Sequence, residues 1–100
     1  MADKIYTIDE IEAVVAPIAR AYGVERITLF GSYARGDATH GSDVDLRIDS
    51  GGQMGYFELA GLQRKLEEQF NLRVDILPTD ALSMDFRNRI KEEEVILYGE

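Results

Sequence analysis

The sequence predicts a fold of the α+β or α/β class, in which helices cover one face of a sheet. Segments 8–22 and 56–70 repeat apolar residues at helical spacing, and three shorter segments alternate apolar with polar residues. The chain has 100 residues, of which 45% are hydrophobic and 30% charged. This length supports one modest core. We therefore expect residues 1–100 to form a single domain.

The first helix is expected to begin after Thr7, because Thr7 and Glu10 fit the two positions of a capping box. Gly23 is suited to end this helix. Pro17 lies in its middle, where proline removes a backbone hydrogen bond. We therefore expect a kink or a division of the helix at Pro17.

Three short strands are expected, at residues 26–30, 43–49 and 72–77, with Pro78 ending the third. Between the first two strands lies a polar segment with one helical turn at 32–35. The apolar positions of the second and third strands are Val44, Leu46, Ile48, Leu72, Val74 and Ile76. Alternation of this kind is typical of a strand that has one face covered.

The second long helix is expected at 56–70, with Phe57, Leu62, Leu66 and Phe70 in the core. A last helix begins near Thr79 or Ser83 and continues into the run Glu92–Glu94. That run is expected to be a solvated helix face, or else a contact for a basic partner. Residues 95–98 fit either the end of this helix or a short strand.

The charge argues against unaided binding of nucleic acid. Eleven basic and nineteen acidic residues give a net charge of −8, and both halves of the chain are acidic. Proteins that hold nucleic acid through its phosphates need a basic face, so a basic protein partner fits better. There is no cysteine and no apolar run long enough to span a membrane. The expected location is cytoplasmic.

Carboxylates follow the polar face of the second expected strand. Asp43 and Asp45 are two residues apart, so their side chains lie on the same face. Asp75 joins them if the third strand lies alongside with its apolar face on the same core. Three carboxylates in one patch repel each other, and divalent cations relieve that repulsion. The alternative is the solvated side of an edge strand, without chemistry.

A glycine-serine turn precedes the acidic pair. Gly31 and Ser32 directly follow the first expected strand, and ten residues separate Ser32 from Asp43. Glycine allows the backbone to approach a phosphate closely, and the serine hydroxyl and backbone N–H groups can hold it. A phosphate turn beside a metal-binding acidic pair would form one nucleotide site.

Nearby residues have alternative interpretations. Arg35 is a candidate for phosphate binding, or a loop cation that pairs with Asp37. Ser42 is also a candidate for the nucleotide site, or it fixes the entry to the strand as an ordinary turn residue. His40 is expected to be an exposed bystander, and Tyr33 to pack as a half-buried aromatic residue.

The stretch from Leu29 to Leu46, LFGSYARGDATHGSDVDL, resembles the signature of the DNA polymerase β-like nucleotidyltransferase superfamily. It is most similar to the minimal nucleotidyltransferases, the small antitoxin partners of HEPN-type toxins. The resemblance implies a nucleotidyltransferase fold, with a mixed sheet of three to four strands flanked by helices. It also implies two Mg²⁺ ions, with ATP as the substrate.

The resemblance further implies roles for five residues. Gly31 and Ser32 match the phosphate-binding turn, and Asp43 and Asp45 match two metal ligands. Asp75 matches a third carboxylate, which would bind the catalytic metal and prepare the acceptor hydroxyl. We therefore expect the three aspartates to be the catalytic residues.

The function implied is a Mg²⁺-dependent protein adenylyltransferase. AMP from ATP would be transferred to a hydroxyl, expected to be a tyrosine of a cognate HEPN ribonuclease toxin, and the chain would act as its antitoxin. One hundred residues leave no room for a second domain, so the partner would complete the site in a homo- or hetero-oligomer. The alternatives are a non-catalytic acidic antitoxin that masks a basic toxin surface, and a nucleotidyltransferase acting on a small molecule.

Overall fold

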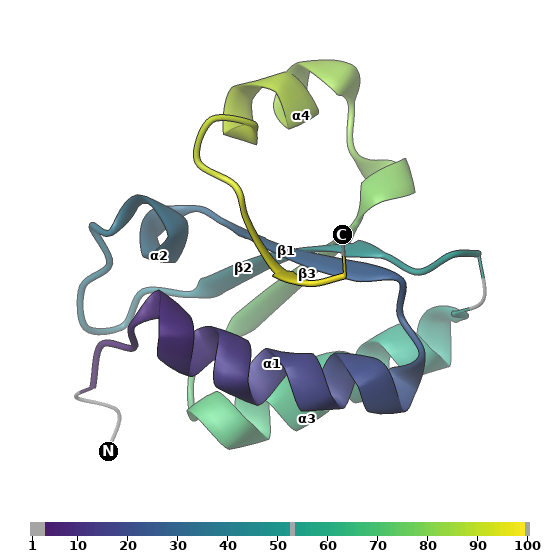
Figure 1. The fold of residues 1–100 in the computed structure, drawn as a ribbon, viewed down its shortest axis with the longest axis horizontal. Helices are drawn as coiled ribbons and strands as arrows, with labels where there is room; N and C mark the ends of the chain where they lie inside the picture. The colour runs from purple at the N-terminus through teal and green to yellow at the C-terminus, as the bar shows by residue number, and fades with distance from the viewer. Residues whose placement is uncertain (1–3, 53, 100) are drawn as a thin grey trace.

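The computed structural model describes residues 4–52 and 54–99, which form a four-stranded mixed sheet with helices on both faces (Figure 1). The strands are β1 (Arg26–Phe30), β2 (Val44–Asp49), β3 (Val74–Pro78) and β4 (Val95–Tyr98). Their order is β3-β2-β1-β4. β1 is antiparallel to both β2 and β4, whereas β2 and β3 are parallel. The predicted fold class is confirmed, and residues 95–98 form a strand.

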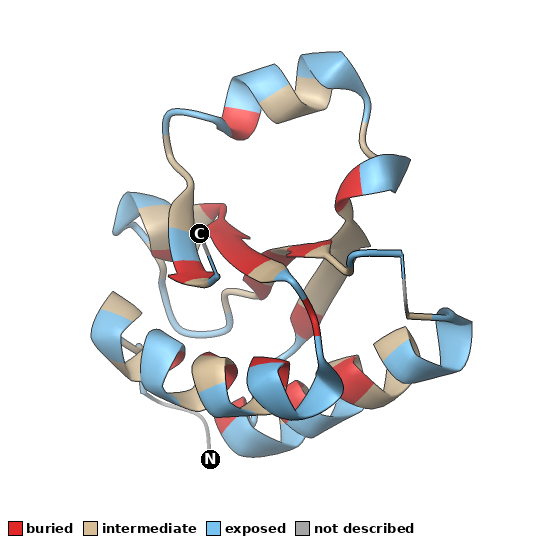
Figure 2. Cartoon of the chain, turned by 45° about the vertical axis from the view of Figure 1, so that its right-hand side comes forward, coloured by how far each residue is buried: buried red, intermediate tan, exposed pale blue. Residues whose placement is uncertain are grey.

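Two long helices, α1 (Ile8–Tyr22) and α3 (Tyr56–Phe70), lie together against one face of the sheet (Figure 1). The buried core fills the space between these helices and the strands, and only the sheet-facing sides of the helices are buried (Figure 2). Its largest fully buried side chains are Phe70, Ile11, Ile27, Leu29, Leu46, Ile48, Leu62 and Leu66. Among the described residues, no helix is long and apolar enough to cross a bilayer.

The predicted ends of α1 are confirmed, but the helix is not divided at Pro17. The Thr7 side chain and Glu10 form the capping box, and Gly23 ends the helix with φ of 72°. Pro17 does not divide α1, which is one helix of 15 residues. Pro17 lies on the exposed side of α1, where water can solvate the carbonyl that lost its partner, while Val15 on the other side is buried.

The prediction that Phe57 belongs to the core is also wrong, because this side chain is 85% exposed. The core positions of α3 are Leu62, Leu66 and Phe70. At 3.6 residues per turn, Phe57 points about 140° away from Leu62 around the helix axis. Phe57 and its neighbour Tyr56 therefore face solvent at the start of α3.

The segment after β3 covers the other face of the sheet. It contains the short 3₁₀ helix η1 (Thr79–Ala81) and α4 (Met84–Ile90), and then descends to β4 beside α2 (Ser32–Arg35) (Figure 1). α4 ends at Ile90, so the prediction of a helix continuing into Glu92–Glu94 is wrong.

Candidate active site

The apolar alternation of β2 fixes the direction of its carboxylates. Val44 and Leu46 are fully buried under the helices, so Asp45 between them points to the opposite face. The parallel pairing of β2 with β3 places Asp45 directly beside Asp75. Asp43 immediately precedes β2. The structure thus brings Asp43, Asp45 and Asp75 to one end of the two strands, and we call them the acidic cluster.

The surroundings of Asp45 disfavour ionisation of its carboxyl group. Burial, followed by repulsion from Asp75 and Asp43 and a hydrogen bond with Asp75, raises the pKa of Asp45 to about 6. Arg35 opposes this shift only weakly, as the smallest of the causes. The negative charge of Asp45 is therefore poorly stabilised by its immediate surroundings.

The Gly31 turn lies directly against Asp45. Gly31 follows β1 with a φ of 80°, a conformation that residues with a side chain rarely adopt. A Cβ atom at this position would collide with the carboxylate of Asp45. Ser32 is half-buried at the start of the short helix α2. Glycine was predicted here because it allows close approach. It is required both by the backbone conformation and by the adjacent carboxylate of Asp45.

Arg35 lies at the end of α2 and contacts two carboxylates. Its Nε donates to Asp37 at 3.2 Å, which is the ion pair weighed as an alternative from the sequence. Its Nη1 donates to Glu93 at 3.3 Å. Glu93 also accepts a hydrogen bond from the Gly31 N–H at 2.6 Å. Glu93 therefore joins the Gly31 turn to Arg35.

Sequence reasoning missed Glu93 as a site residue. The predicted solvated face is wrong for Glu93 and Glu94, whose side chains are 18% and 15% exposed. Glu93 reaches Gly31 across 62 positions of the chain, and no local pattern could have signalled that contact.

Arg73 is a second missed residue. Its Nε lies 3.5 Å from Asp75 and 3.9 Å from Asp43, although the Arg73 side chain is 72% exposed. Its position just before β3, two residues from Asp75, was the available signal. Arg73 thus places an exposed positive charge at the edge of the acidic cluster.

Of the remaining residues, His40 and Ser42 lie in the loop between α2 and β2, and Tyr33 lies in α2. The Ser42 hydroxyl accepts a hydrogen bond from the Thr39 N–H at 2.9 Å, so Ser42 has the turn role weighed from the sequence. His40 is exposed, as expected. Tyr33 is only 4% exposed and packs in the core. Neither His40 nor Tyr33 belongs to the candidate site.

The acidic cluster offers only oxygen ligands, the kind that Mg²⁺ prefers. Among the described residues, no three acidic, histidine or cysteine side chains are arranged to hold one metal ion by themselves. Mg²⁺ commonly binds through one or two carboxylates and completes its coordination with water and substrate phosphates. The acidic cluster beside the Gly31 turn is compatible with that mode, in which the nucleotide supplies part of the coordination.

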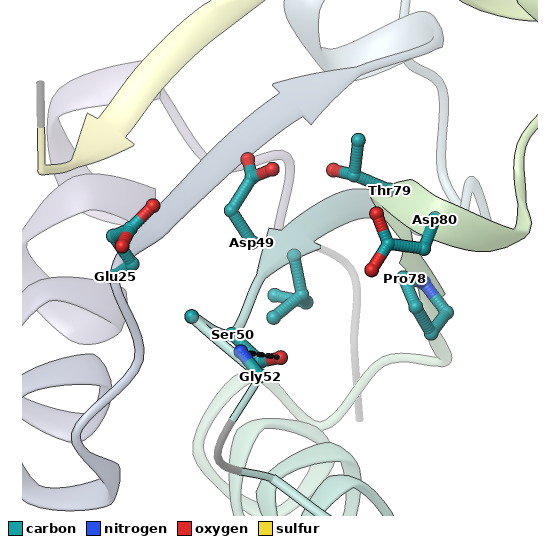
Figure 3. Close-up of a pocket in the computed structure, with 9 residues that line it drawn as sticks. Glu25, Asp49, Ser50, Gly52, Pro78, Thr79 and Asp80 are labelled. Carbon is teal, nitrogen blue, oxygen red and sulfur yellow. Dashed lines mark hydrogen bonds between the residues drawn. The ribbon is translucent and has the colours of Figure 1, made fainter.

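A hollow at the other end of β2 does not suit an anionic substrate. Its lining includes Glu25, Asp49 and Asp80, and the Gly52 N–H donates to the Ser50 hydroxyl at 3.3 Å (Figure 3). The carboxylates in this lining repel phosphate groups. The acidic cluster and the Gly31 turn remain the candidate active site.

Comparison with known proteins identifies the family. The family model of the nucleotidyltransferase domain matches residues 11–98 of this chain. The chain belongs to the nucleotidyltransferase domain family. The matched range contains the Gly31 turn and the whole acidic cluster, so the family resemblance expected from LFGSYARGDATHGSDVDL is confirmed. The chain is a nucleotidyltransferase.

Relatives of similar length support this assignment. A Methanocaldococcus jannaschii protein named for protein adenylyltransferase activity is 34% identical over 88 residues, which cover 88% of this nucleotidyltransferase and 95% of the relative. The protein adenylyltransferase MntA of Thermococcus cleftensis is 31% identical over 93 residues, covering 89% and 94%.

Chains in solved toxin–antitoxin complexes have the same fold as this nucleotidyltransferase. One is a toxin–antitoxin complex with AMP-PNP, with a TM-score of 0.78 at 22% identity over 89% of this chain and 73% of the other. Another contains the tri-AMPylated HEPN toxin of Shewanella oneidensis with its MNT antitoxin, with a TM-score of 0.73 at 19% identity over 94% and 74%.

Proposed function

We propose that this nucleotidyltransferase transfers AMP from ATP to a tyrosine hydroxyl of a HEPN-type toxin and thereby acts as its antitoxin. The observation that carries the proposal is the pairing of Asp45 with Asp75 directly against the Gly31 turn. This arrangement puts candidate metal ligands and a candidate phosphate-binding turn side by side.

The two halves of the site have separate tasks in this proposal. The Gly31 turn, with Ser32 and Arg35, would bind the phosphates of ATP. Asp43, Asp45 and Asp75 would hold two Mg²⁺ ions. Mg²⁺ would neutralise the phosphate oxygens and stabilise the charge that develops on the leaving group. Burial, and after it repulsion from Asp75 and Asp43, raises the pKa of Asp45, and a cation bound nearby would relieve that repulsion, which supports a cation role.

The reaction exchanges one phosphorus–oxygen bond for another. The tyrosine hydroxyl oxygen bonds to the α-phosphorus of ATP, while the bond from that phosphorus to the bridging oxygen breaks. Pyrophosphate leaves with the bonding electrons, and the hydroxyl proton passes to the Asp75 carboxylate and then to water. Asp75 is suited to this step because it lies at the edge of the cluster, with 37% of its side chain exposed.

The proposed partner rests on the relatives and on charge. Two relatives carry the name protein adenylyltransferase, and the HEPN toxin in one structure of the same fold is AMPylated. A ribonuclease needs a basic surface for RNA, and the net charge of −8 on this chain complements such a surface. The acceptor tyrosine would enter the site from the exposed side of Asp75 and Arg73.

The test measures transfer to a HEPN-type toxin offered as the acceptor. The two purified proteins are incubated with ATP and Mg²⁺, and intact-mass and peptide mass spectrometry locate the adduct. We expect adenylyl groups on tyrosine and loss of ribonuclease activity. Asp43→Asn with Asp45→Asn should abolish both results.

The matched control removes the same charge elsewhere. Asp9→Asn with Asp85→Asn changes two exposed carboxylates on α1 and α4, and it should leave transfer intact. If the toxin is inhibited without modification, and both double variants still inhibit it, the chain works by masking a basic surface and adenylyl transfer is excluded.

A further inference from the structure

Glu93 accepts a hydrogen bond of 2.6 Å from the Gly31 N–H, yet it lies outside the stretch from Leu29 to Leu46 that carries the family resemblance. We propose that Glu93 is a positioning residue, which holds the Gly31 turn and Arg35 in the geometry that receives the phosphates of ATP. The inference rests on the proposed function and assigns a task to a residue that lies outside the acidic cluster.

The contact with Gly31 constrains the backbone of the turn. The Gly31 N–H donates to Oε2 of Glu93 at 2.6 Å, and the φ of Gly31 is 80°. A hydrogen bond to a carboxylate is stronger than one between neutral groups. Because glycine has many accessible conformations, a fixed partner for its N–H selects the one that brings the turn against Asp45.

The contact with Arg35 orients its guanidinium. Nη1 lies 3.3 and 3.4 Å from the two carboxylate oxygens of Glu93, and Nε lies 3.2 Å from Asp37. A guanidinium has five N–H groups, so these contacts leave donors for a phosphate. Holding a long side chain in place beforehand reduces the ordering cost of ligand binding.

The segment that carries Glu93 is itself anchored. The N–H groups of Glu93 and Glu94 both donate to the carbonyl of Ile90, at 3.0 and 3.1 Å. Glu94 accepts from Arg47 at 2.6 Å, and Arg47 also donates to Thr79 at 3.0 Å. These bonds fasten the segment that leads from α4 to β4, beside α2, to the face of the sheet opposite α1 and α3 (Figure 1). Glu93 therefore approaches the turn from a fixed support.

The opposite role would make Glu93 a competitor of ATP. Its carboxylate would then occupy the place of a phosphate and would have to leave both Gly31 and Arg35 before ATP binds. The two roles predict opposite effects of removing the charge. Removing the charge should weaken ATP binding if Glu93 is a positioning residue, and should strengthen ATP binding if Glu93 is a competitor.

The first experiment compares Glu93→Gln with Glu92→Gln, which removes the same charge from an exposed neighbour. In nucleotide-free protein, ¹H–¹⁵N NMR should show the Gly31 amide proton far downfield in the wild type and moved upfield in Glu93→Gln. Calorimetric titration with ATP and Mg²⁺ should show affinity lowered about tenfold in Glu93→Gln, the order expected for losing a hydrogen bond to a charged group. Glu92→Gln should match the wild type in both measurements.

The second experiment tests whether Glu93 acts through Arg35. In a double-mutant cycle with Arg35→Met, Glu93→Gln should weaken ATP binding less than it does when Arg35 is present. Glu94→Gln breaks the neighbouring ion pair with Arg47 and reports any general loss of stability. If Glu94→Gln lowered ATP affinity as much as Glu93→Gln, the effect would come from loosening of the segment, and the direct role of Glu93 would be wrong.

The outcomes separate this inference from the proposed function. Tighter ATP binding by Glu93→Gln would overturn positioning in favour of competition. An unchanged Gly31 amide and unchanged affinity would overturn the inference and leave adenylyl transfer intact. If the wild type bound no ATP, the proposed function would fail together with the nucleotide part of the inference, and the Gly31 amide shift would still show whether Glu93 holds the turn.

Discussion

The two faces of β2 differ in what their side chains do. Val44, Leu46 and Ile48 are at most 1% exposed and pack under α1 and α3. Asp45 and Arg47 point to the other face, toward the acidic cluster and the segment that descends from α4. Successive residues of one strand thus serve the core and the chemistry in alternation. Changes on one face should therefore affect stability, and changes on the other should affect activity.

Asp75→Asn should have the largest effect, because it removes a carboxylate on the chemical face of the neighbouring strand. We expect adenylyl transfer to fall by about a thousandfold, since metal-supported charge stabilisation contributes several kcal/mol to such reactions. Stability should not fall, because Asn relieves repulsion with Asp45. Pyrophosphate release measures the rate of adenylyl transfer, and a urea denaturation curve measures the free energy of unfolding. Loss of the fold would contradict the separation of activity and stability between the two faces of β2.

Leu46→Ala should have the next largest effect, on the opposite face of β2. Leu46 is fully buried, and removing a buried leucine side chain costs about 3 kcal/mol. Urea denaturation should show this loss in the free energy of unfolding. Under conditions where the variant remains folded, its rate of adenylyl transfer should stay within a small factor of the wild type. A large loss of rate in the folded variant would show that the two faces are coupled.

The fold was predictable where its causes are local. The capping box at Thr7, the helical spacing of 56–70 and the alternation of 43–49 each involve residues close in the sequence. The errors arose where tertiary context decides. Exposure of Pro17 let α1 continue, and Phe57 was assigned to the core from its apolar character although it lies off the buried side of α3.

The candidate site was predictable only in part, for a similar reason. The Gly31 turn and Asp43 with Asp45 lie within one short motif, and Asp75 follows from strand alternation once β2 and β3 are adjacent. Glu93 comes from a distant segment, and its distance to Gly31 depends on how α4 crosses the sheet. Spacing in the sequence contains no information on that path.

Asp45→Asn should change the free energy of unfolding by less than Leu46→Ala does, and the change should depend on pH. The pKa of Asp45 in the folded protein is raised from 3.8 to about 6, so the folded state binds a proton that the unfolded state has released. Without metal, the stability of the wild type should therefore fall as pH rises from about 4 to about 6. Above that range the loss of stability from ionising Asp45 should be complete. Asp45→Asn should remove this fall.

The gain from Asp45→Asn above pH 7 should be about 1 to 2 kcal/mol after allowance for solvent screening of this half-exposed group. Thermal or urea denaturation in the presence of a chelator measures it. Adding Mg²⁺ should stabilise the wild type above pH 6 more than the variant, because only the ionised carboxylate attracts the cation. Equal slopes with pH for the two proteins would show that Asp45 is not the responsible group.

Phe57→Ser should have the smallest effect on the free energy of unfolding. It is compared with a substitution of Phe70, the other phenylalanine of α3. Phe57 is 85% exposed on α3, whereas Phe70 is 1% exposed and packs edge-on against Tyr6 with ring centroids 5.2 Å apart. Phe57→Ser should change the free energy of unfolding by less than about 0.5 kcal/mol, as expected for a surface position. Phe70→Ala should cost about 3 to 5 kcal/mol. A large loss from Phe57→Ser in urea denaturation would mean that the first turn of α3 is covered in solution, so that burial would extend beyond the sheet-facing side of this helix.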